Sequence, residues 1–541
     1  MSDAIRPPAE TPAGDEISVT MTARGMPPIE AGSPRDRGKG PFRRMVLRGA
    51  TVIDGTGSPP NGPMDIVVEN GRITEMVLVG VPKMKIDPAR RPAKGDFEID
   101  CHGKWVTPGF IDCHVHTGIF LHAANGEQAP ADYVYRLWLA HGITTVRDMG
   151  SMNGLGWTLR QKAASEANEI VAPRIMAYAY FPAVDEWLKV LHTPEEGRAW
   201  MRAVAERGAD GVKFFGAPPA IFKAALAEAK DVGLRTGCHH QHMALASLNA
   251  LTTAGWGLTS TEHFYGVPEA MFERSRIQAY PPNYQFMDEY VRYNSSSQNF
   301  LSAAEPGSTK WNETLDRFLD LDHTFVPTLA ILEANRDLMR ARRADWHDKY
   351  THKNVWDYFE PQRGGHGSYW YEWSTRNEVE WKEHFRRWSA FVRDYKNKGG
   401  RVCPASDAGF IYQIYGFGFI RDLEWFQEAG FHPLEIIRAA TLSGAELMGL
   451  TEETGTVATG KCADLLVHQE NPLEDLKYLY GTGALRLNDD KGRTEWRRGL
   501  QYTIRNGVVY DPAELLADVR EIVARSWDGT SIDTKLGQDE A

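Results

Sequence analysis

Residues 107–118 read Thr-Pro-Gly-Phe-Ile-Asp-Cys-His-Val-His-Thr-Gly, an apolar strand pattern that ends in His114 and His116. Because side chains alternate between the two faces of a strand, residues two positions apart point the same way. Both imidazoles can therefore converge on one ion from a rigid backbone. The alternative is a pair of surface histidines on a half-exposed strand. The apolar run, the Pro-Gly turn before it and further candidate ligands downstream favour a metal site.

The middle of the chain alternates short apolar segments with helical stretches, which predicts a parallel sheet with crossover helices. The strand candidates are residues 110–116, 143–147, 175–181, 211–215, 235–239, 258–263, 325–329 and 402–407. Eight such units fit an α/β fold with a TIM-like (β/α)8 barrel. In that fold the chemistry lies at the C-terminal ends of the strands.

Two β-rich regions flank this middle region. Residues 45–54 have a strand pattern, and residues 66–75 have the pattern of a hairpin that turns at Asn70-Gly71. Residues 463–467 and 502–511 have the same β pattern. We therefore expect a small β-sandwich domain built from both chain ends. The expected division is a draped or disordered arm (1–44), an N-terminal segment of the β-sandwich (45–106), the barrel (107–450), a C-terminal segment of the β-sandwich (451–515), and a C-terminal helix and tail (516–541).

Composition narrows the class of protein. The 541 residues suit one large and one small domain, and 42% hydrophobic with 25% charged residues is typical of a soluble globular protein. The net charge of -11 gives no general attraction to nucleic acid, and no apolar run is long enough to span a bilayer. Five cysteines without short-range pairing, and a start without a hydrophobic signal core, predict a cytoplasmic protein. We expect a homo-oligomer with a small-molecule substrate and no membrane or nucleic-acid partner.

Residues 280–398 hold two long connections. A predicted helix there carries aromatic and apolar residues on one face, which we interpret as packing against the barrel: Trp381, Phe385, Trp388, Val392 and Tyr395. The aromatic-rich loop at 364–373 is either a lid or a subunit contact, and the sequence leaves both open.

Further polar residues end the predicted strands, namely Lys213, His239, His263 and Asp407. A lysine at the end of a buried strand is costly unless it is paired or neutral. Burial lowers a lysine's pKa, and a neutral amine can add carbon dioxide to form a carbamate, an anionic ligand able to bridge two metals. A salt bridge at the barrel mouth is the alternative for Lys213.

With these strand-end residues, the chain resembles the amidohydrolase superfamily over roughly residues 45 to 515. The resemblance is to the binuclear branch of aminoacylase, prolidase and ochratoxinase-like enzymes. The matching motifs are Thr107-Pro-Gly-Phe-Ile-Asp-Cys-His-Val-His116, Gly142-Ile-Thr-Thr-Val-Arg-Asp148, Glu262-His263, Ala405-Ser-Asp-Ala-Gly409, Ala440-Thr-Leu-Ser-Gly-Ala445 and Gly455-Thr-Val-Ala-Thr-Gly-Lys-Cys-Ala-Asp464.

The resemblance implies two divalent metal ions. His114, His116 and Asp407 would bind one ion, His239 and His263 the other, and Lys213, as N6-carboxylysine, would bridge them. The fifth strand ends Gly237-Cys-His-His-Gln-His242, so strand register favours His239 as the ligand, whereas counting back from His263 favours His242. Zinc suits these donors best, with manganese, iron and cobalt as alternatives.

The implied reaction is hydrolysis of a carboxamide bond, as in an N-acyl amino acid or a dipeptide. The ions would hold a bridging water as hydroxide, and Asp407 would carry its proton to the leaving amine. The alternatives are a deaminase or a cyclic amide or lactone hydrolase and, from another class, an inactive scaffold protein. Aromatic residues at or after strand ends suggest a bulky or aromatic acyl group: Tyr180, Phe215, Tyr265, Phe410 and Tyr412. The substrate itself stays open.

Overall fold

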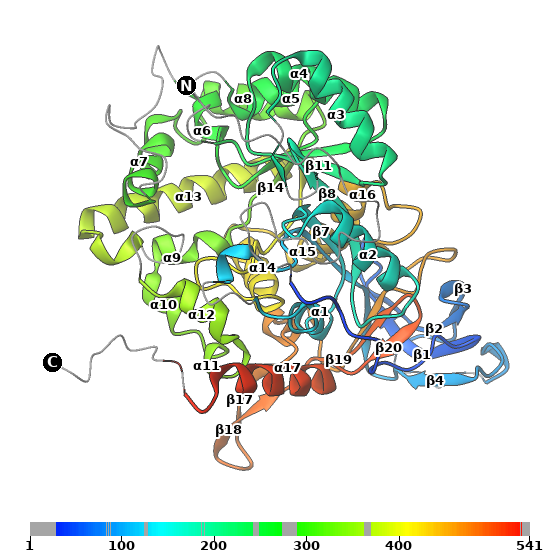
Figure 1. Ribbon diagram of the computed structural model, residues 1–541. Helices are drawn as coiled ribbons and strands as arrows, with labels where there is room; N and C mark the ends of the chain where they lie inside the picture. The colour runs from blue at the N-terminus through cyan, green and yellow to red at the C-terminus, as the bar shows by residue number, and fades with distance from the viewer. Residues whose placement is uncertain are drawn as a thin grey trace.

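We describe the protein from a computed structural model (Figure 1). The structure describes residues 29–82, 84, 86, 88–123, 128–184, 187–188, 190–241, 248–272, 289–361, 369–530 and 532. His242, residues 364–368 of the aromatic-rich loop and residues 1–28 of the predicted arm lie outside these residues.

The centre of the molecule is an eight-stranded parallel sheet in which sequential strands are neighbours. Its strands are β6 (Phe110–Val115), β7 (Ile143–Gly150), β8 (Arg174–Tyr180), β11 (Gly211–Phe214), β12 (Arg235–Cys238), β13 (Ser260–Glu262), β14 (Thr324–Val326) and β15 (Arg401–Val402). Each predicted strand corresponds to one of these. A parallel sheet of strands that alternate with helices agrees with the expected TIM-like barrel.

Backbone hydrogen bonds connect β6, at one edge of this sheet, to the segment that follows β15 at the other edge. The Cys113 amide on β6 donates to the Pro404 carbonyl at 3.4 Å, and the Asp407 amide donates to the His114 carbonyl at 2.9 Å. The sheet therefore curls until the segment after β15 meets β6. This closure brings the histidines of the first strand beside the aspartate that follows the last.

Helices surround the barrel, and α3–α5 and α8 gather along the top of Figure 1. The described α-helices are α1 (Ala131–Ala140), α2 (Leu155–Glu166), α3 (Pro194–Glu206), α4 (Pro219–Asp231), α5 (Ala250–Gly255), α6 (Val267–Ala270), α7 (Glu289–Ser302), α8 (Thr309–Asp320), α9 (Glu333–Arg336), α10 (Leu338–Arg342), α11 (His347–Tyr350), α12 (Lys353–Phe359), α13 (Thr375–Asn397), α14 (Phe417–Glu428), α15 (Pro433–Arg438), α16 (Gly444–Met448) and α17 (Pro512–Trp527).

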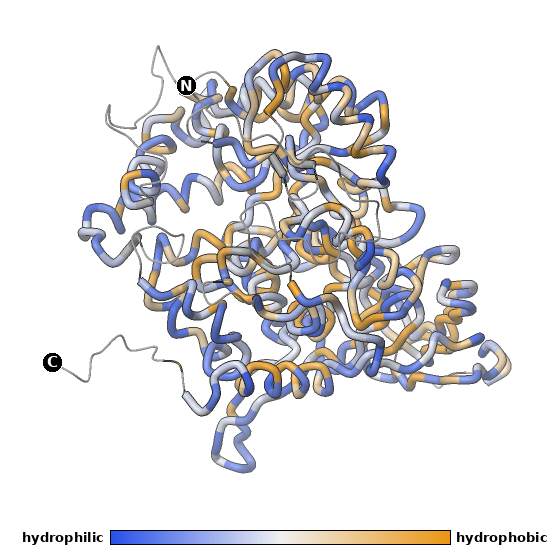
Figure 2. Tube along the Cα trace, viewed as in Figure 1, coloured by the Kyte–Doolittle hydropathy of each residue, from blue (hydrophilic) through white to orange (hydrophobic). Residues whose placement is uncertain are grey.

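Local sequence explains where several helices begin. At α3, the Thr193 side chain accepts a hydrogen bond from the Glu196 amide while the Glu196 carboxylate accepts from the Thr193 amide, and Pro194 takes the first helical position. This capping box satisfies amides that the first turn leaves unpaired. At α17, the Asp511 side chain accepts from the Ala513 amide in the same role. The apolar residues of α17 are orange in Figure 2, and Leu515, Leu516 and Val519 among them are buried.

The predicted amphipathic helix is α13. All five residues assigned to its apolar face are buried, as expected. Phe325 of β14 contacts two of them, with ring centroids 6.2 Å from Trp388 and 4.8 Å from Tyr395. This face therefore packs on the barrel.

Strands from both chain ends share a second sheet, seen at the lower right of Figure 1. Its order is β20-β19-β16-β5-β1-β2-β3, with β4 also paired to β1. The strands are β1 (Arg44–Val52), β2 (Asn61–Glu69), β3 (Arg72–Leu78), β4 (Phe97–Asp100), β5 (Trp105–Pro108), β16 (Leu465–His468), β19 (Leu500–Arg505) and β20 (Val508–Tyr510). The expected two-layer sandwich is not confirmed, because the described strands from the two ends form one sheet.

Two short antiparallel pairs complete the strands, β9 (Ala183–Val184) with β10 (Trp187–Leu188) and β17 (Ala484–Asn488) with β18 (Arg493–Arg497). The described portion of the predicted arm lies along the body of the protein: the Arg35 amide donates to the Glu169 carbonyl at 2.7 Å and the Lys39 amide to the Val509 carbonyl at 2.9 Å. Among the described residues, no helix is long and apolar enough to cross a membrane.

Candidate metal centre

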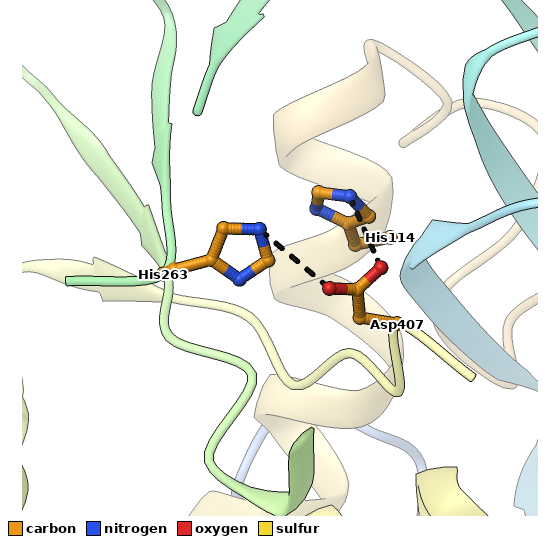
Figure 3. A group of neighbouring side chains, drawn as sticks. All are labelled: His114, His263 and Asp407. Atoms are coloured by element: carbon orange, nitrogen blue, oxygen red, sulfur yellow. Dashed lines mark ion pairs between the residues drawn. The ribbon is translucent and has the colours of Figure 1, made fainter. Parts of the chain in front are cut away.

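Three polar side chains converge at the C-terminal ends of the barrel strands. Donor atoms of His114, His263 and Asp407 all lie within 4.8 Å of one another. Figure 3 shows the two imidazoles beside different oxygens of one carboxylate, with His114 Nε2 3.7 Å from Asp407 Oδ1 and His263 Nε2 3.6 Å from Asp407 Oδ2. His116 completes the arrangement, since its Nε2 lies 3.3 Å from Asp407 Oδ1. Three imidazoles thus surround one carboxylate.

The backbone adopts an unusual conformation at two of these residues. His263 has φ of 61° and Asp407 has φ of 47°, in the left-handed region that costs a non-glycine residue free energy. Hydrogen bonds hold each in place: the His263 amide donates to the Val326 carbonyl, and the Asp407 amide donates to the His114 carbonyl, both at 2.9 Å. Both chain segments have therefore left the regular strand where they supply a side chain to the centre.

Hydrogen bonds also orient the imidazole rings. His114 Nδ1 lies 2.7 Å from a Glu262 carboxylate oxygen, and His263 Nδ1 lies 2.6 Å from the Thr328 hydroxyl. Since an ionised carboxylate only accepts hydrogen bonds, His114 donates from Nδ1 and leaves the lone pair on Nε2. Histidines that bind a metal ion through one ring nitrogen typically form a hydrogen bond through the other ring nitrogen.

The charge states suit metal binding. Burial lowers the pKa of His263 to about 4 and that of His114 well below its ordinary value, so both imidazoles are neutral at pH 7. Burial alone would raise the pKa of Asp407, but the surrounding histidines hold it below its ordinary value. Neutral imidazole and ionised carboxylate are the forms that bind divalent ions.

Lys213 extends from β11 toward the same point. It is 1% exposed, and its Nζ lies 3.2 Å from His114 Nε2. Burial lowers its pKa to about 8. Within the described ranges no carboxylate forms an ion pair with Lys213, which disfavours the salt-bridge interpretation of this lysine.

His239 follows β12 at the edge of the group. Its ring centroid is 4.8 Å from that of His263, and it stacks between Phe215 at 5.0 Å and Tyr265 at 4.4 Å. Its donor atoms are not included in the compact group of His114, His263 and Asp407. Because His242 lies outside the described residues, the choice between His239 and His242 stays a prediction.

Four of the five candidate substrate-contacting aromatics lie near these residues. Phe215 and Tyr265 flank His239, Tyr180 contacts Phe215 at 5.2 Å, and the Phe410 ring is 5.9 Å from that of His116. Tyr412 has different surroundings. It is fully buried, and its hydroxyl bonds to the Phe359 carbonyl, to Arg342 and to Tyr371. The Tyr412 side chain therefore packs and forms hydrogen bonds within the protein, whereas the other four aromatic residues lie near the ligand candidates.

The donor chemistry supports an ion at this place. Three imidazole Nε2 atoms face one carboxylate, and at His114 and His263 the other nitrogen already has a hydrogen-bond partner. Nitrogen and carboxylate oxygen donors of this kind suit zinc and similar divalent ions. The residues present therefore fit a divalent metal ion.

Several residues behind the centre have no role predicted from the sequence. Arg147, Ser260, Glu262 and Thr328 are completely buried and bond to ligand candidates or to one another. The available signal was charge: an arginine and a glutamate inside buried strands each require a partner.

Comparison with known proteins identifies the family of the chain. The model of the amidohydrolase family matches residues 105–278 and 395–486, which include all six proposed ligands. The chain belongs to the amidohydrolase superfamily.

Curated relatives match only over short stretches. An imidazolonepropionase from Thermoplasma acidophilum is 35% identical over 12% of this chain and 16% of its own length. An N-acyl-D-aspartate deacylase from Alcaligenes xylosoxydans xylosoxydans is 30% identical over 30% of this chain and 25% of its own length. The aligned part of this chain thus covers a quarter or less of the length of each relative.

Solved structures match over most of the chain. A putative prolidase from Bifidobacterium longum superposes with a TM-score of 0.56 at 20% identity, covering 89% of this chain and 99% of that one. Bottromycin amidohydrolase gives a TM-score of 0.60 at 18% identity, covering 90% and 91%. At these identities the likeness establishes the fold.

Proposed function

We propose that this protein is a metal-dependent hydrolase that cleaves the C–N bond of a small carboxamide, such as an N-acyl amino acid or a dipeptide. The observation that carries the proposal is the convergence of three imidazoles on the Asp407 carboxylate at the barrel mouth. Membership of the amidohydrolase superfamily and similarity to a deacylase and a prolidase support the same reaction class.

In this proposal two ions, most simply zinc, would be held at the centre. His114, His116 and Asp407 would hold one, and His239 and His263 the other. Lys213 would bridge them after its amine nitrogen attacks carbon dioxide and releases a proton, which yields N6-carboxylysine. When bound, divalent ions lower the pKa of water toward neutrality and polarise a carbonyl group.

Asp407 is the proposed proton carrier. Its carboxylate accepts the proton of the attacking water and then gives it to the nitrogen of the leaving amine. Its side chain is 13% exposed, and the Nε2 atoms of three imidazoles lie 3.3 to 3.7 Å from its carboxylate oxygens. His114 and His263, each fixed through Nδ1, cannot turn away from it.

The aromatic residues suggest which chemical group of the substrate lies beside the centre. Phe215 and Phe410 present rings near His239 and His116 respectively, and a bulky or aromatic acyl group complements such surfaces. Tyr180 and Tyr265 extend the same aromatic wall.

An assay panel tests this function. The full chain, freed of metal by a chelator and reloaded with Zn²⁺ in bicarbonate buffer, is offered N-acyl amino acids, dipeptides, aryl amides, lactones and cyclic amides. We expect metal-dependent release of an amine from members of the first three classes. Turnover confined to lactones or cyclic amides would contradict the proposal in favour of the alternative.

A further inference from the structure

A buried network lies directly behind His114. Glu262 of β13 is completely buried, and its carboxylate accepts from three side chains. Arg147 of β7 donates from Nη2 to both oxygens at 2.9 Å, the Ser260 hydroxyl donates at 2.6 Å, and His114 Nδ1 lies at 2.7 Å. The carboxylate thus has a charge partner and a hydrogen-bond partner besides the histidine.

Arg147 joins three strands of the barrel. Besides Glu262, it donates from Nε to the Cys113 carbonyl on β6 and from Nη1 to the Ser260 hydroxyl at 3.1 Å. The Cys113 carbonyl belongs to the residue before His114. One guanidinium therefore positions both the backbone that precedes the histidine and the carboxylate that contacts its ring.

A glycine makes room for this arrangement. A Cβ atom added to Gly237 on β12 would lie 2.6 Å from the Glu262 carboxylate and 2.7 Å from the Met149 side chain. A larger residue at this position would require the Glu262 carboxylate or the Met149 side chain to shift. The space beneath the centre is consequently shaped by β6, β7, β12 and β13 together.

Burying a charged pair is expensive unless the geometry is good and the remaining hydrogen-bonding groups have partners. Arg147 and Glu262 meet both conditions, and the ring nitrogen that Glu262 contacts is Nδ1 of His114. The opposite nitrogen, Nε2, faces Asp407 and Lys213. The pair therefore has a specific geometric effect: it holds the tautomer in which Nε2 carries the lone pair.

We infer that Arg147, Glu262 and Ser260 form a positioning network that sets the tautomer and orientation of His114 and thereby the affinity of the barrel centre for its metal ion. This inference rests on the proposed metal centre. Glu262 is a positioning residue, because it touches the histidine and not the reacting atoms.

Zn²⁺ affinity of the full chain tests the inference without reference to substrate. Metal-free protein is titrated with Zn²⁺ against a competing chelator, and bound zinc is counted by mass spectrometry. Outer partners of metal-binding histidines typically contribute about 10- to 100-fold in metal affinity. We expect Glu262→Gln, which keeps the size but removes the charge, to weaken the tighter-bound ion by that factor, and excess Zn²⁺ to restore occupancy.

Glu333→Gln is the matched control. Glu333 and Arg421 form another buried pair with two short hydrogen bonds, at 2.9 and 2.6 Å, and among the described residues no histidine bonds to this pair. This control should lose stability but keep the wild-type Zn²⁺ affinity. The cobalt-substituted proteins give a second measurement, since a reoriented His114 would change the visible absorption in Glu262→Gln only.

Ser260→Ala provides a milder change should Glu262→Gln fail to fold. It removes one donor to the carboxylate but keeps the ion pair, and we expect a loss of affinity of about threefold or more, below the full outer-partner effect. Wild-type Zn²⁺ affinity in the folded variants, with wild-type protein binding zinc, would overturn the network alone. Failure of the wild-type chain to bind zinc would instead overturn the proposed metal centre and the inference with it.

Discussion

At the scale of single residues, Lys213 has the most specific proposed chemistry. Its amine is buried beside His114 Nε2. If it carries the bridging carbamate, Lys213→Ala should lose at least one ion per chain and nearly all activity, with partial rescue by a small carboxylic acid. Metal analysis and amide hydrolysis measure both effects. Lys162→Ala, which removes a lysine paired with Asp210 away from the centre, should retain wild-type metal content.

Wild-type metal content in Lys213→Ala would contradict the binuclear model, in which a carbamate on Lys213 bridges two ions.

Asp407 has two proposed roles that one substitution separates. Asp407→Asn keeps the size and one acceptor oxygen but removes the basic site, so the ions should be largely retained while turnover falls. A general acid-base group contributes about 10²- to 10⁴-fold, and the loss should appear in kcat more than in KM. Steady-state kinetics on protein of measured metal content tests this. A metal-loaded Asp407→Asn within about threefold of wild-type kcat could not have lost its proton carrier.

At the scale of elements, the end of β12 distinguishes a strand-borne ligand from a loop-borne one. His239 follows the strand directly, and its amide donates to the Phe214 carbonyl of β11 at 3.0 Å. We therefore expect His239→Asn to reduce metal occupancy strongly and His242→Asn to change it little. Metal counting on both variants is the measurement, each serving as the control for the other. The opposite result would assign the ligand to the loop.

The helix α13 offers a prediction about stability. Trp388 is fully buried against Phe325 and Phe391, whereas Val379 on the same helix is 58% exposed. Replacing a buried tryptophan by alanine costs about 3–5 kcal/mol, and an exposed substitution changes stability by about 0.5 kcal/mol or less. Urea unfolding of Trp388→Ala and Val379→Ala should show this difference. Equal stabilities would mean that α13 does not pack on the barrel as described.

At the scale of the whole molecule, an ion pair joins the barrel to the sheet built from both chain ends. Arg174 of β8 donates to the buried Asp464 carboxylate at 2.7 Å, and Asp464 also accepts from the Asn506 amide at 2.8 Å. Burial alone would raise the pKa of Asp464, but Arg174 and Arg505 hold it below its ordinary value. Asp464→Asn leaves Arg174 without its charge partner, which typically costs about 3–5 kcal/mol.

The pH dependence of that cost follows from the sign of the pKa shift. A carboxyl group with a lowered pKa in the folded state contributes fully above its unfolded pKa, about 3.9, and loses its contribution as the pH falls through the folded value. The free energy of unfolding of wild type and Asp464→Asn should therefore differ most near pH 7, and the difference should narrow toward pH 3. Asp322 forms a more exposed ion pair with Arg401, so the free energy of unfolding of Asp322→Asn should differ little from that of wild type at either pH. A constant difference for Asp464→Asn would contradict this linkage.

The sequence by itself determined the barrel and the identity of its strand-end ligand candidates. Strand periodicity is a local property, so the alternation of apolar segments with helices predicted all eight strands, and the His-x-His pair was visible at the end of the β6 segment. Strand ends were less predictable. The 402–407 candidate was expected to run to Asp407, yet β15 ends at Val402, and the chain enters the left-handed region at Asp407.

Only the tertiary structure decided what surrounds those ligands. Arg147, Glu262 and His114 lie on β7, β13 and β6, far apart along the chain, and meet only because the barrel closes. The same closure placed Asp407 beside His114 and His116, and strands of both chain ends joined into one sheet. Such contacts depend on register and curvature, which arise from the packing of all strands together, so no local pattern contains them.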